Sequence, residues 1–131
     1  MICRLSNPVT EQGVRKTEAR GQKLIWYTPT QYCQFDPTQR NLGVKGCTAA
    51  LYSMCIESNG DVLPCQSYYT SLGNILDDDW NSIWNHDLAV RLRERKGLPA
   101  KCDGCDLLAE CGGGCPLKFE ETNLISLELP A

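Results

Sequence analysis

The pattern of hydrophobic and polar positions changes several times along the first third of the chain. Residues 1–22 are polar and charged, with little periodicity. Residues 23–28 are rich in β-forming side chains and end at Pro29, a pattern that predicts one strand. Residues 29–46 contain several prolines and glycines, so we expect a connector there.

The clearest local signal is a β-hairpin. Residues 51–57 and 61–66 flank the loop sequence Ser-Asn-Gly. A two-residue turn at 59–60 would place Met54 opposite Cys65. Because a one-residue slip turns every side chain to the other face, the choice of register decides which cysteines lie together.

The alternative register uses a three-residue loop that ends at Gly60 in the left-handed conformation. It sets Ile56 opposite Val62, as part of an apolar face, and places Cys55 and Cys65 together on the other face. We prefer this register because it separates the apolar side chains from the thiols.

Two short helices are predicted after the hairpin. An acidic run at 77–79 precedes apolar residues spaced i, i+3, i+4, which predicts a short helix whose Trp80 and Trp84 anchor the core. Asp87 is expected to cap a second helix over residues 88–96, which basic residues and then a glycine terminate.

Residues 99–116 are too rich in cysteine and glycine for regular structure, and a bound metal is the obvious organiser. The fold class predicted is therefore small α+β: a cysteine-bearing β-hairpin, short helices and irregular metal-binding loops.

Composition narrows the chemistry, because nine of the 131 residues are cysteine. The N-terminus has no apolar signal-peptide core, and an odd number of thiols does not suit a disulfide scaffold. We therefore expect a reducing, cytoplasmic location, where clustered cysteines usually bind metal. No long apolar run suggests a membrane span, and a formal net charge of -3 does not favour a nucleic-acid partner.

Four cysteines form a run with the spacing Cys102-x2-Cys105-x5-Cys111-x3-Cys115. A Cys-x2-Cys pair brings two thiolates to one metal centre from a tight loop, as zinc and iron–sulfur sites both require. Three glycines at 112–114 permit unusual backbone angles and close approach to a bulky cluster. The proline after the last cysteine is typical of ferredoxin-type runs, so iron–sulfur is favoured over zinc.

A second cysteine group, Cys47-x12-Gly60-x4-Cys65, precedes this run. Together the two groups resemble the SPASM family of auxiliary iron–sulfur domains, whose pattern is C-x(9–15)-G-x4-C followed by C-x2-C-x5-C-x3-C. The resemblance extends over about residues 47–116. It divides the chain into an N-terminal segment and connector, residues 1–46, and a SPASM-like cluster-binding domain, residues 47–131.

The resemblance implies one or two [4Fe–4S] clusters. The ligands implied for the first cluster are Cys47, Cys65 and Cys115, with Cys55 as a plausible fourth. Those implied for the second cluster are Cys102, Cys105 and Cys111. Cys55 is equally compatible with a buried free thiol. A zinc-binding structural or interaction module is the alternative, and a single Zn²⁺ would use all four cysteines of the run.

The sequence departs from the family pattern in two respects. No cysteine follows Cys115, so the fourth ligand of the second cluster is left open among Glu120, Glu121, a water and Cys33, and an open or unoccupied site is a further alternative. The C-x3-C-x2-C signature of radical S-adenosylmethionine enzymes is missing as well. We therefore expect a fragment or a split protein that is not catalytic alone, in which residues 23–28 resemble the last strand of the catalytic barrel.

The function that the resemblance implies is that of an auxiliary domain in an enzyme that modifies peptides or proteins. It would transfer electrons or position the substrate for a radical S-adenosylmethionine catalytic domain, in cis or in trans. The expected partners are thus that domain and a peptide or protein substrate.

The remaining candidates have structural interpretations. Cys3 and Cys33 are expected to be free thiols, and His86 is expected at the surface or in a helix cap. The basic residues between 91 and 101 are expected to form a solvated helix end.

Overall fold

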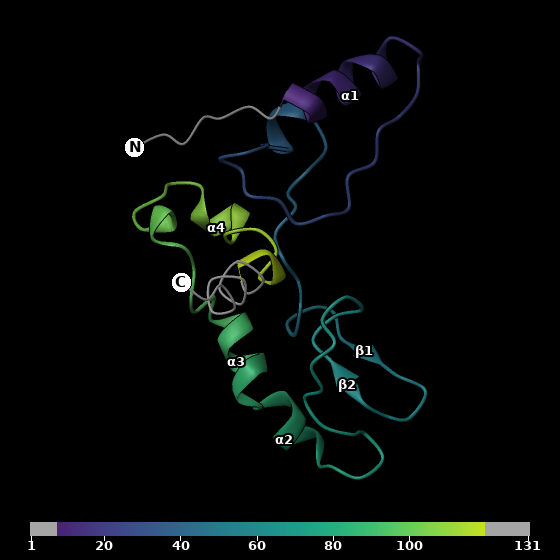
Figure 1. Cartoon of the computed structure of the whole chain (residues 1–131), viewed down its shortest axis with the longest axis vertical. Helices are drawn as coiled ribbons and strands as arrows, with labels where there is room; N and C mark the ends of the chain where they lie inside the picture. Colours follow the sequence, from purple (N-terminus) through teal and green to yellow (C-terminus); the bar gives the residue numbers. More distant parts are fainter. Residues whose placement is uncertain (1–7, 120–131) are drawn as a thin grey trace, which may run out of the picture. The chain divides into compact units, whose positions relative to one another are not determined.

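The computed structural model describes residues 8–119, which form two compact units (Figure 1). Unit 1 contains residues 8–47 together with 99–119, and unit 2 contains residues 48–98. The expected boundary after residue 46 remains a prediction. None of the helices in the described part of the chain has the length and apolar character needed to cross a membrane.

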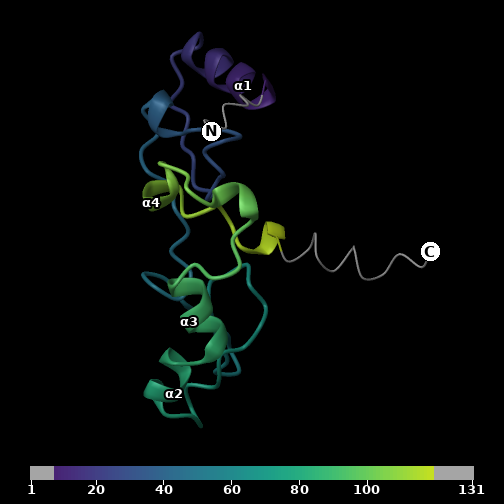
Figure 2. The same ribbon diagram turned by 90° about the vertical axis from the view of Figure 1, so that its left-hand side faces the viewer.

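Unit 1 begins with a helix that the polar pattern did not predict, α1 (Pro8–Glu18). Its one strongly buried apolar side chain among residues 11–18 is Val14, which is 3% exposed. Basic residues in the last turn favour the helix through its dipole. The single-turn helix η1 (Thr38–Arg40) lies beside α1 in both views, and Arg40 Nη2 is 2.8 Å from Glu11 Oε1 (Figures 1 and 2).

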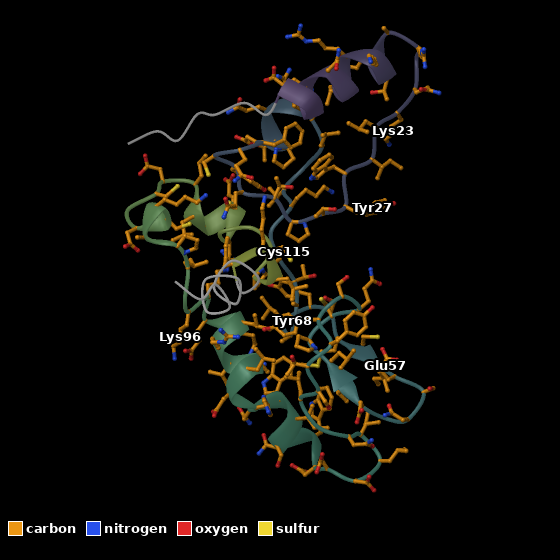
Figure 3. The ribbon with its side chains drawn as sticks, in the orientation of Figure 1. Lys23, Tyr27, Glu57, Tyr68, Lys96 and Cys115 are labelled. Carbon is orange, nitrogen blue, oxygen red and sulfur yellow. The ribbon has the colours of Figure 1, made fainter. Side chains whose placement is uncertain are left out.

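The strand predicted over residues 23–28 does not form, and this prediction was wrong. No described segment pairs with these residues, and a strand without a partner leaves its backbone groups to water. Tyr27 is 82% exposed and projects outward (Figure 3). Trp26 instead packs on Phe35, with the ring centroids 4.8 Å apart, and its Nε1 donates to Thr30 Oγ1 at 2.8 Å.

Unit 2 contains the β-hairpin, β1 (Cys55–Ile56) and β2 (Val62–Leu63), in the preferred register. The strands are antiparallel, with Ile56 opposite Val62 and Cys55 opposite Leu63. Gly60 adopts a φ of +93° at the end of the three-residue loop, as that register requires. The register prediction is therefore confirmed.

Only part of the predicted apolar face of the hairpin is buried. Val62 and Leu63 are both buried, whereas Ile56 is 55% exposed. The second edge of β2 is paired with a segment that the sequence did not reveal. There the Val62 N–H donates to Gly73 O, and the Leu72 N–H donates to Val62 O. The short sheet therefore buries β2 and leaves β1 at its edge.

Two short helices complete unit 2, α2 (Trp80–Trp84) and α3 (Asp87–Arg93). Asp79 caps α2, because its Oδ2 accepts from the Asn81 N–H at 2.9 Å. The cap of α3 is His86 rather than Asp87: its Nδ1 accepts from the Leu88 N–H at 3.2 Å. The capping role expected of the histidine is thus confirmed, and the predicted cap was one residue late.

The tryptophans of α2 differ in burial. Trp80 is 49% exposed, so its prediction as a core anchor was wrong; Ile83, between the two tryptophans, is fully buried. Trp84 is half-buried beneath Arg93, whose guanidinium carbon lies 4.2 Å from the ring centroid. The guanidinium also donates to Ala50 O and Trp84 O, so the half-buried Arg93 is bonded within unit 2 and is not simply part of a solvated helix end.

The cysteine run lies in unit 1 and contains two single-turn elements, η2 (Ala100–Cys102) and α4 (Leu108–Cys111). The rest of residues 99–116 is turns, close to the predicted irregular loop. A two-stranded antiparallel sheet with several short helices confirms the predicted small α+β fold class.

Candidate metal centre

The four cysteines of the run are positioned by turns and by short helix ends. Cys102 is the last residue of η2, and its carbonyl accepts from the Cys105 N–H at 3.2 Å. Cys111 is the last residue of α4, so its side chain is held at a helix C-terminus. Cys115 lies in the segment that follows α4 (Figure 3).

The glycines between Cys111 and Cys115 have the unusual angles that the sequence indicated. Gly112, Gly113 and Gly114 have φ values of +62°, +82° and +86°, and all three are buried. Because other residues adopt such angles only with strain, three successive positive φ values favour glycine at these positions. The triplet thereby turns the chain sharply between Cys111 and Cys115.

Cys111 is the most enclosed thiol in the described part of the run, at 7% exposed. Its sulfur accepts a hydrogen bond from the Tyr32 N–H at 3.3 Å and lies 3.6 Å from Thr30 O, to which the thiol donates. These partners are about eighty positions away in sequence. A backbone N–H directed at a thiolate is the kind of contact that orients a metal ligand and tunes the metal.

The thiol of Cys102 is placed among other thiols. Burial raises its pKa, and the nearby thiols of Cys111 and Cys105 raise it further, while Lys101 acts in the opposite direction. A raised pKa means that the proton is retained in the absence of metal. Binding of iron or zinc must therefore displace a proton from this site.

Tyr32 and Gln31 surround the thiols without contributing sulfur. Burial raises the pKa of Tyr32, and nearby Cys111 and carboxylates add to the effect, against a hydrogen bond from the Lys45 N–H to its hydroxyl. Gln31 is 5% exposed, and its Oε1 accepts from Lys101 Nζ at 2.5 Å. Lys101, the residue before the first cysteine of the run, is therefore hydrogen-bonded to a segment that is distant in sequence.

Cys47 also belongs to unit 1. The backbone before it approaches α4 closely: a Cβ built on Gly46 would lie 3.0 Å from Glu110 O and 4.0 Å from Cys111 O. The structure thus places Cys47 and Cys115, two ligands implied for the first cluster, in the same compact unit.

The other two ligands implied for that cluster, Cys55 and Cys65, are in unit 2. Cys55 begins β1, and Cys65 follows β2 by two positions; both are half-buried. In the observed register, Cys55 is opposite Leu63, so its side chain shares a face with that residue. The complete first ligand set remains a prediction.

The chemistry of the donor set suits an iron–sulfur cluster. The residues that are free thiols include Cys55, Cys65, Cys102, Cys105, Cys111 and Cys115. Thiolates are the common protein ligands of [4Fe–4S] clusters, and a backbone donor already faces one of these sulfurs. Within residues 8–119, no three Cys, His, Asp or Glu side chains converge on a single ion-sized position.

Sequence reasoning missed the residues that surround the thiols. Gln31 and Tyr32 lie in the predicted connector, where no local pattern indicates contact with a cysteine run about eighty positions away. Lys101 was recognised as part of a basic stretch, but its bond to Gln31 depends on the fold. Glu120 and Glu121, considered as ligands, lie outside the described residues, as does Cys3.

Comparison with known protein families matches residues 47–106 to SPASM, an iron–sulfur cluster-binding domain. Neither curated proteins nor solved structures gave a match to the chain. The matched segment contains the hairpin cysteines and the Cys-x2-Cys pair, and Cys111 and Cys115 follow directly. Residues 47–106 of this chain are therefore similar to the SPASM domain, a similarity that implies the binding of iron–sulfur clusters.

Proposed function

We propose that the chain is the auxiliary cluster domain of a radical S-adenosylmethionine enzyme that modifies peptides or proteins. It binds [4Fe–4S] clusters through the cysteines of the run and of the hairpin. The observation that carries the proposal is the combination of the SPASM match with thiols that the fold gathers in unit 1.

The ligands in this proposal are those implied by the family resemblance. Cys102, Cys105 and Cys111 hold one cluster. The other is held by Cys47, Cys55, Cys65 and Cys115. When bound, the clusters supply sites that accept and donate single electrons, at potentials set by burial and hydrogen bonds to sulfur. The chain's own part is to orient Cys111 through the Tyr32 N–H and to surround its sulfur with protein.

The catalytic step belongs to a partner domain in this proposal, because the chain has no C-x3-C-x2-C motif. That partner is a radical S-adenosylmethionine domain, on the same polypeptide or on another, and the substrate is a peptide or a protein. The auxiliary domain transfers electrons to or from the partner, or positions the substrate beside it. The family match does not favour the zinc module as an alternative.

The first test is anaerobic purification of the full chain, followed by assays for iron, sulfide and zinc and an absorption spectrum. We expect about four to eight iron and sulfide per chain, with a broad band near about 400 nm. Stoichiometric zinc without sulfide, even after anaerobic reconstitution with ferrous iron and sulfide, would refute cluster binding.

A second test addresses the enzymatic context. The loaded chain by itself should accept electrons from dithionite, seen as a paramagnetic signal, and should leave S-adenosylmethionine intact. Cleavage of S-adenosylmethionine by the isolated chain would show that the catalytic step is not confined to a partner.

A further inference from the structure

A single helical turn at residues 31–35 is attached to the cysteine run from several directions. The N–H groups of Gln34 and Phe35 both donate to Gln31 O, at 2.8 and 3.0 Å, which closes the turn. The first N–H groups of such a turn have no partner within it and point away from its end. One of these groups, that of Tyr32, donates to the sulfur of Cys111.

Gln31 fixes this turn to both ends of the run. Its side-chain oxygen accepts from Lys101, the residue before the first cysteine. A Cβ built on Gly114, the residue before the last cysteine, would lie 2.9 Å from Gln31 Cγ and 3.1 Å from Gln31 N. The turn therefore lies directly against the run, and a buried polar side chain keeps it there.

The contact falls on the sulfur side of Cys111. Tyr32 N and Thr30 O are 3.3 and 3.6 Å from Sγ, whereas Gly46 approaches the carbonyl side of the same helix end, next to Glu110 O. Consecutive Cα atoms are about 3.8 Å apart, so the next residue of the turn begins within one residue's length of the N–H that reaches this sulfur. That residue is Cys33, a half-buried cysteine in the same unit.

A [4Fe–4S] cluster is commonly held by four thiolates, and Cys102, Cys105 and Cys111 provide three. We propose that Cys33 is the fourth ligand of this cluster. This inference rests on the proposed function and adds one ligand to it. On binding, each thiol loses its proton to solvent as its sulfur bonds to iron. The contact from the Cys111 thiol to Thr30 O then ends, while the Tyr32 N–H remains as a donor to the thiolate.

The test compares the full chain with Cys33→Ala and Cys33→Ser after anaerobic reconstitution with ferrous iron and sulfide. The wild-type chain is expected to hold about eight iron. Cys33→Ala should lose about one to four of these and, after mild oxidation, show the paramagnetic signal of a three-iron cluster. Cys33→Ser should recover part of the loss, because its hydroxyl oxygen can still bind iron.

Gln34→Ala is the matched control, because it changes the same turn without removing a thiol. Gln34 Oε1 accepts from Lys118 Nζ at 3.1 Å, three residues after Cys115, so the substitution also removes a contact between the turn and the chain beyond the run. We expect wild-type iron content in this variant. An equal loss in Gln34→Ala and Cys33→Ala would show that the turn matters only structurally, and would overturn the assignment of Cys33.

Alkylation with iodoacetamide, read by mass spectrometry, tests the same ligand in the unaltered protein. Cys33 should be protected in the loaded chain, together with Cys102, Cys105 and Cys111, and should react after chelation of the iron. Equal alkylation of Cys33 in loaded and stripped chains, with the other three protected, would overturn the inference alone. A wild-type chain that takes up no iron and sulfide would instead refute the proposed function.

Discussion

At the scale of single residues, the environment of Gln31 explains how the cysteine run is held. Its side chain is buried and bonded to Lys101, and its backbone and Cγ lie against the position where Gly114 lacks a side chain. A buried polar group without a partner costs about 1–3 kcal/mol, so the bond to Lys101 matters to the stability of unit 1. The close approach is possible only because residue 114 is glycine.

Gly114→Ala is expected to destabilise the loaded chain by about 1–3 kcal/mol. The new Cβ would meet Gln31 Cγ at 2.9 Å and Gln31 N at 3.1 Å, with a φ of +86° that alanine rarely adopts. The measurement is the midpoint of urea unfolding of the full chain under anaerobic conditions, with circular dichroism as the signal.

Gly43→Ala is the matched control, because Gly43 has a φ of +77° but nothing within 4 Å of an added Cβ. It isolates the backbone strain, worth about 1–2 kcal/mol for a residue in the left-handed conformation. Equal shifts in the two variants would mean that the contact with Gln31 has no energetic weight.

At the scale of elements, caps and loop geometry determine where the short helices and strands begin. Asp79 and His86 each accept from an N–H in the first turn of a helix, at 2.9 and 3.2 Å. Helices of five and seven residues gain little from propensity alone, so such caps are a large part of their local stability. The hairpin depends likewise on Gly60, which supplies the positive φ of its loop.

Asp79→Ala should lower the free energy of unfolding by about 0.5–2 kcal/mol, through the loss of the cap of α2. Asp79→Asn should retain most of the stability, because its amide oxygen can accept from the Asn81 N–H. Asp77→Ala removes an exposed carboxylate of the same acidic run that caps no helix. Chemical denaturation of the three variants provides the comparison, and a loss in Asp77→Ala equal to that in Asp79→Ala would contradict the capping argument.

At the scale of the whole molecule, ligation of metal is expected to supply much of the order of the cysteine run. Residues 99–116 contain only two single-turn elements and otherwise turns, so few local backbone bonds hold them. When a site is assembled from ligands far apart in sequence, the free energy of metal binding contributes directly to folding. The run and the residues 31–35 that lie against it should therefore respond together to the loss of metal.

Removal of iron should expose the run to proteolysis. Trypsin cleavage after Lys101 is expected to be slow in the loaded chain and to accelerate at least about tenfold after chelation, a change worth about 1.4 kcal/mol in the opening equilibrium. Cleavage after Lys16, in α1 and outside the run, is the internal control and should change much less. Mass spectrometry of the fragments over time gives both rates, and a uniform acceleration would contradict a local role for the metal.

The amino-acid sequence by itself determined the features that depend on neighbouring residues. The cysteine spacing indicated cluster chemistry, in agreement with the family match over residues 47–106. Gly60 and the alternation around it gave the hairpin register, because turn geometry is local. The glycines of the run predicted a backbone that other residues avoid, and three positive φ angles confirm this.

Only the tertiary structure decided the features that depend on distant partners. Residues 23–28 have the composition of a strand but pair with no strand among residues 8–119, and they are irregular. α1 forms in a polar segment and buries Val14, and the polar pattern gave no indication that this side chain would be buried. The approach of Tyr32 to Cys111 joins positions about eighty residues apart. Such contacts follow from burial and packing in three dimensions, which short-range patterns do not encode.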